Sequence, residues 1–120
     1  MKIIYALCSL VVLALCVSCN TSLYRDIAVS LPDLTNKASG TYRGEQDFPG
    51  TPIKVILDVT LQNQSIISIN VIRHFCSPVG KRAEIIIENI ITRQSLDVDI
   101  VSGATVSSKA ILKAVENALQ

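Results

Sequence analysis

Residues suited to phosphate chemistry gather in one segment near the C-terminal end of the sequence. From Asp97 to Ser108 the chain reads DVDIVSGATVSS. The glycine permits a tight turn or a positive φ, and the Thr and Ser residues after it are of the kind that caps helix starts. A helix start attracts anions because its first N–H groups and the positive end of its dipole point outward. The segment therefore indicates a turn followed by a helix that could receive a phosphate.

The charges along the following helix fit this interpretation. Its first turn carries Lys109 and no acidic residue, whereas Glu116 lies near the opposite end. This order is the reverse of the one that stabilises an isolated helix. It leaves the start of the helix free to compensate an external negative charge.

The same segment resembles the flavinylation motif of the FMN-binding domain family. That family is found in the C and G subunits of the sodium-pumping quinone reductase and its ferredoxin-linked relative, and in extracytoplasmic flavin reductases. Its pattern is Asp, two residues, Ser or Thr, Gly, Ala, Ser or Thr, two residues, and Ser or Thr. The resemblance extends over residues 40–120, and the matching motif positions are Asp99, Ser102, Gly103, Ala104, Thr105 and Ser108.

The resemblance implies a covalently bound FMN. A flavin transferase that uses FAD and magnesium, and that releases AMP, would attach FMN to Thr105 through a phosphoester. Asp99 and Ser108 would act in motif recognition or local capping, and Gly103 and Ala104 would let the phosphate and ring approach the backbone. In the alternative interpretation the hydroxyl residues are simple helix caps, Asp99 is a surface charge and Gly103 is a turn residue.

Two further side chains are candidates to line a flavin. His74 and Cys76 follow the second predicted strand of the hairpin in the sequence HFCSP. A neutral imidazole or a thiol could hydrogen-bond the ring and shift its reduction potential. In the alternative interpretation, His74 is a solvated loop residue and Cys76 an inert filler.

The first residues have the character of an export signal. After Met1 and Lys2 an uncharged apolar run extends to Val17, and the polarity changes at Ser18. We therefore expect a signal peptide over residues 1–18. Cys19 at its end resembles the lipidated cysteine of bacterial lipoproteins, although Cys16 stands where that motif usually has Leu. Plain cleavage and a retained anchor stay open as alternatives.

The cysteines predict no disulfide in the mature chain. Of four cysteines, Cys8 and Cys16 would leave with the signal peptide and Cys19 would be acylated, so only Cys76 would remain. No Cys/His pattern has the spacing of a zinc site, and no metal is expected.

Residues 19–39 mix polar and apolar side chains without a sustained period, and we expect a tether there. The compact domain is expected over residues 40–120, which is near the small end of what can bury its own core. A short strand is predicted at 40–44. Two alternating runs then predict an antiparallel hairpin, with the inward-facing positions Val55, Leu57, Val59, Leu61, Ile67, Ile69 and Val71.

Two helices are expected after the hairpin. One has a helical stripe of Ala83, Ile86, Ile87, Ile90 and Ile91, and the other, over 107–119, has Ala110, Ile111, Ala114, Val115 and Ala118. Strands followed by helices predict an α+β fold, with a small antiparallel sheet and two packed helices.

The composition narrows the class of function. Eleven Lys and Arg against ten Asp and Glu, with no basic cluster and few aromatic residues, argue against nucleic-acid binding. We expect an exported FMN-carrying electron-transfer protein at the extracytoplasmic face of the cell membrane. It would pass electrons between a membrane donor and an extracytoplasmic redox partner. The alternatives are a flavin-dependent reductase acting directly on a small acceptor and a non-redox lipoprotein interaction module.

Overall fold

The chain forms a small sheet followed by helices. The structure, a computed structural model, describes residues 27–75 and 80–120. Strands β1 (Gly40–Asp47), β2 (Lys54–Gln62) and β3 (Ser65–Phe75) pair antiparallel in that order. A 3₁₀ helix, η1 (Gly80–Ile85), leads into α2 (Ile86–Arg93), and a loop then leads to α3 (Thr105–Leu119). The predicted α+β class is confirmed.

Some predictions fall on residues outside this description. They are the signal peptide at 1–18, the lipidation of Cys19 and the role of Cys76. Within the described ranges, no helix is both long and apolar enough to cross a membrane.

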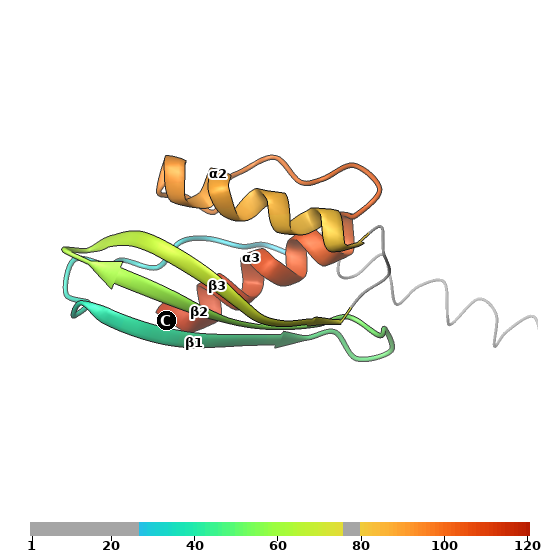
Figure 1. The fold of residues 1–120 in the computed structure, drawn as a ribbon, viewed down its shortest axis with the longest axis horizontal. Helices are drawn as coiled ribbons and strands as arrows, with labels where there is room; N and C mark the ends of the chain where they lie inside the picture. The colour runs from blue at the N-terminus through green and yellow to red at the C-terminus, as the bar shows by residue number, and fades with distance from the viewer. Residues whose placement is uncertain (1–26, 76–79) are drawn as a thin grey trace, which may run out of the picture.

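Both helices pack on one face of the sheet (Figure 1). α3 lies against β1 and β2, whereas α2 lies against β3. The alternating residues of β2 fill the space beneath them, as predicted: Val55, Leu57, Val59 and Leu61 are all buried. The predicted stripe of α3 is buried as well. No helix of the described residues covers the other face of the sheet, which carries the ion pair Arg43–Asp58.

The hairpin turns through two residues that lie in the left-handed region. Asn63 has φ 52° and Gln64 has φ 65°. Positive φ at both central positions is the pattern of a type I′ turn, whose twist suits adjoining strands. The sequence alone does not predict this turn type, because residues 62–65 lack the glycine that usually occupies a type I′ turn.

Two register shifts change the inward face of β3 from the predicted one. Between Thr60 and Leu61 the pairing shifts by one residue. As a result Ile66 is buried, while Ile67 is 49% exposed, so its predicted inward position is wrong. A second shift places His74 opposite Val55 and therefore on the inner face, because an extra residue reverses the alternation after it.

The close approach of α3 to β1 depends on Gly44. A Cβ atom at Gly44 would lie 1.9 Å from the carbonyl oxygen of Ala114 and 2.8 Å from Cβ of Ala118. Asn117 adds a polar contact from the same part of α3, since its Nδ2 donates to the carbonyl oxygen of Glu45 at 2.9 Å. The backbone of α3 is therefore seated directly on β1.

The other helix is fixed to the sheet by a side chain that substitutes for a neighbouring strand. Gln94 ends α2 in the left-handed conformation. Its amide accepts from the Ile66 N–H at 2.7 Å and donates to the Ile66 carbonyl oxygen at 2.8 Å. Both backbone groups of Ile66 are thereby satisfied at this edge of the sheet.

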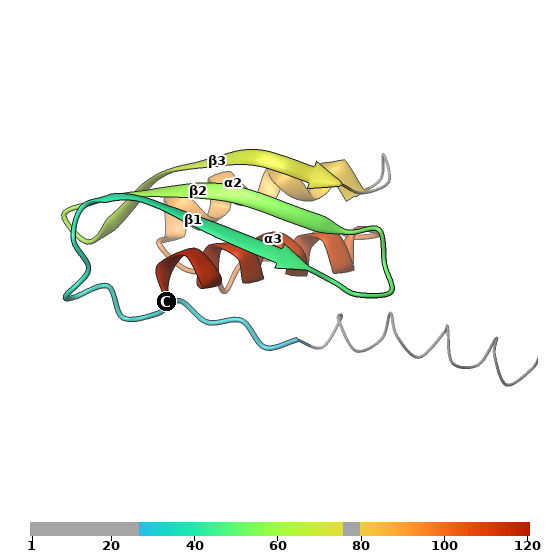
Figure 2. The same ribbon diagram turned by 90° about the horizontal axis from the view of Figure 1, so that it is seen from below.

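Residues 27–39, which we call the strap, pack against the domain. Leu34 belongs to the buried core, and Ile27, Val29 and Leu31 pack against it. Figure 2 shows the strap running beside α3. Over this stretch the expected tether is therefore part of the folded unit.

The helices start differently from the prediction. The first begins as the 3₁₀ helix η1 and becomes α-helical only at Ile86, although Ala83, Ile86 and Ile90 are buried as predicted. The second begins at Thr105 instead of Ser107. Its first residue is thus the predicted acceptor threonine.

Candidate functional site

A tight turn leads directly into α3. The Ala104 N–H donates to the Val101 carbonyl oxygen at 3.0 Å. Gly103, the third residue of this turn, has φ 80°. That combination is typical of a type II turn, which requires a residue able to adopt positive φ at its third position. Gly103 therefore has the predicted turn role, and its conformation sets the direction in which α3 starts.

Ser108 ties this turn to the first turn of the helix. Its side chain is buried, and its hydroxyl donates to the Ala104 carbonyl oxygen at 2.7 Å. The same hydroxyl accepts from the Val101 N–H at 3.3 Å. Because both its donor and an acceptor position are in use, Ser108 is a positioning residue and is not presented to an incoming group.

The other hydroxyls of the motif have different surroundings. Ser102 is exposed at the turn, Ser107 is buried, and Thr105 is partly exposed at the first position of α3. Among the described residues, the Thr105 hydroxyl has no hydrogen-bond partner. Thr105 is thus the helix-start hydroxyl that is both open and unengaged.

The start of α3 has the features that a phosphate requires. The first helical hydrogen bond of α3 is donated by the Ser108 N–H to the Ala104 carbonyl oxygen at 2.9 Å. Within the described ranges, the N–H groups of Thr105, Val106 and Ser107 have no acceptor. The helix has no side-chain cap and no acidic residue in its first turn. Three free donors at the positive end of a helix fit a phosphoester on Thr105.

The predicted caps are therefore corrected. Ala104 is the N-cap residue, and no side chain caps the helix. The Ser108 hydroxyl instead donates to the carbonyl oxygen of Ala104, four residues earlier. Thr105 is the first residue of the helix and not its cap. Asp99 is exposed ahead of the turn, and no hydrogen bond or ion pair of its side chain to the described residues is found. A role for Asp99 in recognition by another protein stays a prediction.

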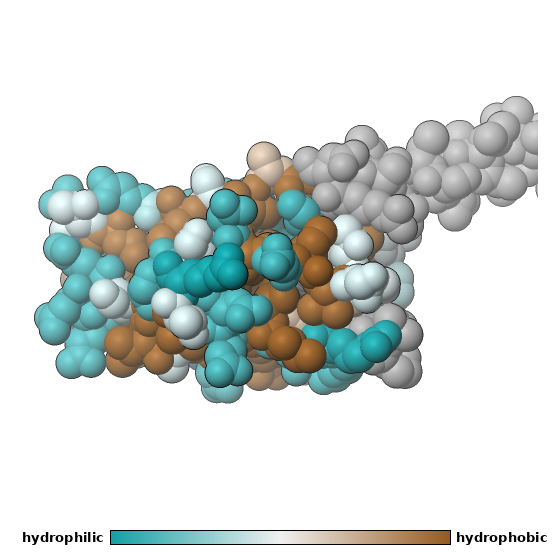
Figure 3. Space-filling model, turned by 90° about the horizontal axis from the view of Figure 1, so that it is seen from above, coloured by the Kyte–Doolittle hydropathy of each residue, from teal (hydrophilic) through white to brown (hydrophobic). Residues whose placement is uncertain are grey.

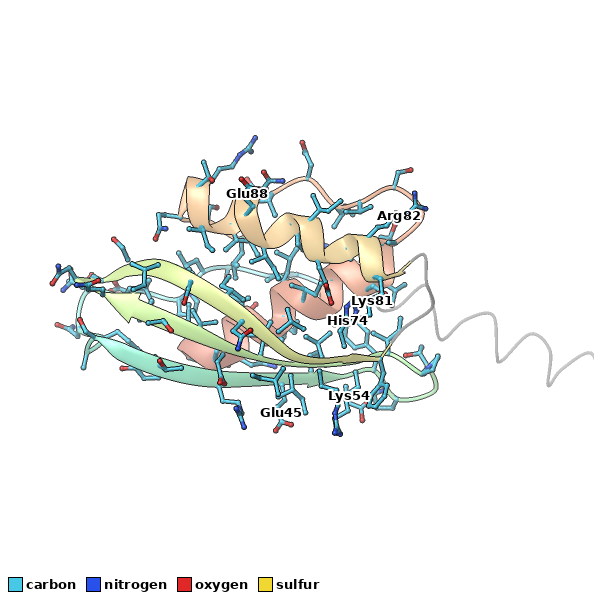
Figure 4. The ribbon with its side chains drawn as sticks, viewed as in Figure 1. Glu45, Lys54, His74, Lys81, Arg82 and Glu88 are labelled. Carbon is cyan, nitrogen blue, oxygen red and sulfur yellow. The ribbon has the colours of Figure 1, made fainter. Side chains whose placement is uncertain are left out.

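Basic side chains surround this end of the domain. Figure 4 places Lys54, Lys81 and Arg82 at the end of the molecule where β2, η1 and α3 begin, and we call it the Thr105 end. η1 contacts α3 there. Lys81 lies 3.6 Å from Glu84, while Arg82 has no ion pair within the described part of the chain. Lys54 and Arg82, which have no ion pair among the described residues, therefore favour an anion at this end, against the exposed carboxylate of Asp99.

His74 also lies toward the Thr105 end, inside the protein. It belongs to β3 instead of a loop, its side chain is fully buried, and its Nδ1 lies 3.1 Å from Glu84 Oε1. Its Nε2 is buried without a partner. The interpretation of His74 as a solvated loop residue is wrong, because the register shift turns it inward. A contact between His74 and a flavin stays a prediction.

Sequence reasoning located the motif and missed the residues that support it. Glu84, the partner of His74, gave no signal because the two residues are ten positions apart and meet only after β3 turns into η1. The backbone of Val101, which both the turn and Ser108 engage, cannot be identified from a side-chain pattern. Across the two described ranges, no group of three His, Cys, Asp or Glu residues is placed to hold a metal ion.

Comparison with known proteins agrees with this geometry. The family model of the FMN-binding domain matches residues 50–120. This range covers β2, β3, η1, α2, α3 and the whole motif, and begins ten residues after the start of β1. No curated protein matches the chain significantly.

Proposed function

Because the chain belongs to the FMN-binding domain family, we propose that it is an extracytoplasmic electron-transfer protein with FMN linked to Thr105 by a phosphoester. The flavin would alternate between oxidised and reduced forms and so supply the redox chemistry that the protein's own side chains lack. The chain's part is to hold the phosphate, to position the link and to present the group to redox partners.

The observation that carries this proposal is the difference between the hydroxyls at the start of α3. The Thr105 hydroxyl is open and unengaged, while the Ser108 hydroxyl is buried and used twice. A modifying enzyme must reach the acceptor oxygen, so Thr105 is favoured over Ser108. The free N–H groups beside it would compensate the charge of the resulting phosphodiester.

The attachment step balances without an oxidant or reductant. The Thr105 Oγ1 attacks the FMN phosphorus of FAD, a new O–P bond forms, and the bond to the AMP phosphate breaks. AMP leaves, and the hydroxyl proton passes to a base of the flavin transferase. Magnesium and FAD belong to that enzyme.

We propose a carrier and not a self-sufficient enzyme. The sequence has no glycine-rich dinucleotide motif, and the folded unit is too small to add a second nucleotide site beside the flavin. Electrons would come from a membrane donor and pass to an extracytoplasmic redox partner. An exported carrier benefits from a covalent link because a dissociating flavin would be lost to the surroundings.

The location rests on the N-terminal sequence. An uncharged apolar run follows Lys2, and a cysteine stands at its end. We propose export through a signal peptide over residues 1–18 and attachment to the membrane by lipid on Cys19, or by the apolar run itself if it is retained.

Intact-mass analysis after co-expression with a flavin transferase tests the link. The wild-type chain should gain one FMN less one water, Thr105→Ala should gain nothing, and Thr105→Ser should regain the modification because it restores a hydroxyl. Ser108→Ala serves as the matched control: it should still be modified on Thr105, although more slowly. Modification of Thr105→Ala would overturn the assignment.

The colour of the same preparations separates the alternatives. A yellow protein of unmodified mass would mean non-covalent FMN. A colourless protein would contradict electron transfer and favour an interaction module. Turnover of a small acceptor by the flavin-loaded chain, with an artificial donor and no partner protein, would favour the reductase.

A further inference from the structure

The strap follows α3 from its beginning to its end. At the start, Lys109 Nζ donates to the Ile27 carbonyl oxygen at 3.2 Å. Further along, the Ser30 N–H donates to Glu116 Oε2 at 3.2 Å. Lys37 Nζ then donates to the carbonyl oxygen of Gln120, directly after the helix, at 3.0 Å. Strap and helix therefore run in the same direction.

The strap is firmly held along this path. Glu116 is buried and accepts from Lys113 at 2.9 Å and Gln120 at 3.0 Å as well as from Ser30. The apolar residues Val29, Leu31 and Leu34 are packed against or within the core. The position of Ile27 is thus fixed relative to the start of α3, where Lys109 binds its carbonyl oxygen.

This arrangement limits how far Thr105 can be from a membrane anchor. Eight Cα steps separate Cys19 from Ile27, and a fully extended chain covers about 29 Å over that length. If residues 19–39 were all free, the reach would be about 75 Å. The strap therefore shortens the usable tether by more than half and makes it leave from the end of α3 that carries Thr105.

The surface at the Thr105 end has the character of a membrane-interface surface. Phe75 at the end of β3 is 54% exposed, and Lys54 is its partner in the sheet register. The Arg73 guanidinium lies 5.3 Å from the centre of the Phe75 ring. Lys81 and Arg82 lie at the same end (Figure 4). Exposed aromatic side chains among basic ones suit the headgroup region of an anionic bilayer.

Acidic groups at this end offset the basic ones only in part. Asp47 is opposite Lys54 in the register, Glu84 is shared between His74 and Lys81, and Asp99 is exposed just ahead of the turn that precedes Thr105. Arg82 remains as an uncompensated charge among the described residues. On the adjoining face, hydrophobic side chains also reach the surface over α2 and its flanking segments (Figure 3). Two exposed isoleucines, Ile85 and Ile100, belong to those segments.

We propose that the Thr105 end of the domain rests on the anionic bilayer surface, with the strap holding it in that orientation. This proposal rests on the membrane attachment proposed above. It makes the electron partner of the flavin a group within or at the bilayer, since the opposite end of α3 lies about 22 Å farther along the helix axis.

Tryptophan fluorescence can test the orientation because the chain contains no Trp. Two exposed apolar residues of β3 are matched probe positions: Phe75 at the Thr105 end and Ile67, eight residues away and 49% exposed, near the hairpin turn. The full chain with its own N-terminal segment, as Phe75→Trp or Ile67→Trp, is reconstituted into vesicles of phosphatidylethanolamine and phosphatidylglycerol. Spin-labelled lipids then quench any Trp near the interface, measured against identical vesicles without the label.

We expect several-fold stronger quenching of Phe75→Trp than of Ile67→Trp. Adding Lys81→Glu and Arg82→Glu to Phe75→Trp should reduce its quenching while the chain still floats with the vesicles. Equal quenching of the two probes, or stronger quenching of Ile67→Trp, would overturn the orientation. If the chain floats with the vesicles and neither probe is quenched, the proposed orientation is also overturned. The Thr105 end would then be available to a protein partner.

The test separates this inference from the function on which it depends. A chain that fails to float with vesicles would overturn both the membrane attachment and the orientation. A chain that floats with the wrong probe quenched would overturn the orientation alone. FMN loading, read from the intact mass of the same preparations, reports on the flavin link independently of either result.

Discussion

The two ends of α3 are built in opposite ways. At the C-terminal half, Gly44 of β1 lies directly against the helix backbone, and Asn117 and Glu116 bind neighbouring segments. At the N-terminal end, the cap is Ala104, no side chain of the described residues bonds the free N–H groups, and Thr105 is partly exposed. The difference teaches that the closest backbone contact of α3 with the sheet lies away from the residue that is to be modified.

This division suits a protein that must be loaded by another enzyme. A transferase needs the acceptor hydroxyl to be accessible, and accessible helix starts contribute little to stability. The packed half of α3 can supply the missing stability without covering Thr105. Variants that affect only one of the two ends should therefore separate folding from FMN loading.

The largest effect is expected from Gly44→Ala in the packed half. The new Cβ would collide with the carbonyl oxygen of Ala114 at 1.9 Å, and a backbone atom of a helix cannot move aside alone. Overpacking of this kind costs about 3 kcal/mol of unfolding free energy. Chemical denaturation followed by circular dichroism would measure the loss.

Glu45→Ala is the matched control for this variant. Glu45 is the next residue of β1, is exposed, and projects to the other side of the strand. Its replacement should change the unfolding free energy by less than about 0.5 kcal/mol. If Gly44→Ala were as stable as Glu45→Ala, the close seating of α3 on β1 would be wrong.

Glu116→Ala should have the next largest effect, because it detaches the strap from α3. The Ser30 N–H and the Lys113 ammonium would both lose their acceptor. Unsatisfied, partly buried donors cost about 2 kcal/mol in such a case. Limited proteolysis should then cut within residues 27–39, while cleavage elsewhere in the domain stays slow.

Lys113→Ala distinguishes strap release from the loss of an ion pair. It removes the cation and leaves the bond between Ser30 and Glu116 intact. We expect a smaller loss of stability and an uncut strap. Equal cleavage of the strap in the two variants would contradict the role of Glu116 in holding it.

Much of the packed half of α3 could be predicted from the sequence. The stripe of Ala110, Ile111, Ala114, Val115 and Ala118 has the helical period, and that period identifies the buried face directly. The motif could be predicted too, because its six positions are close together in sequence. Local patterns of this kind depend on residues that are neighbours along the chain.

The rest depends on contacts between distant segments. The register shifts of β3 arise from pairing with β2, whereas alternation alone predicts Ile67 inside the sheet and His74 in the following loop. The strap has no period of its own, since it is a single extended segment fitted to the side of α3. The sequence alone predicts a helix cap at Ser108, because a hydroxyl near a helix start has the same residue type whichever way it bonds; in the structure it donates back to Ala104.

Gly103→Ala should affect the other end of α3, with a smaller cost in stability. Alanine at φ 80° lowers the unfolding free energy by about 1 kcal/mol. If the backbone rotates to relieve this strain, the turn that precedes Thr105 is reoriented. The rate of FMN attachment by the transferase, followed by intact mass, should fall more than the stability does. Asp97→Ala, at an exposed position outside the motif, should load at the wild-type rate.

The smallest effect is expected on the open face of the sheet. Arg43 adjoins Gly44 in β1 but points away from α3, and its Nε lies 2.8 Å from Asp58 Oδ1. This hydrogen bond lowers the pKa of Asp58 below its ordinary value of 3.8. A carboxyl group whose pKa is lowered by folding stabilises the protein above its unfolded-state pKa. That contribution is lost as the pH falls through the folded-state pKa.

Comparison of wild type with Arg43→Gln by denaturation between about pH 6 and about pH 3 would measure this contribution. The difference in stability between the two proteins should be small near neutral pH and should shrink as the pH falls, because Asp58 becomes protonated and the pair is lost in the wild type as well. Salt should reduce it further, since both side chains are accessible to solvent. If Arg43→Gln instead lowered the unfolding free energy as much as Gly44→Ala, the ion pair would stabilise β1 as strongly as the contact with α3 does. The packed half of α3 would then not be the main source of stability, and the contrast between the two ends would lose its basis.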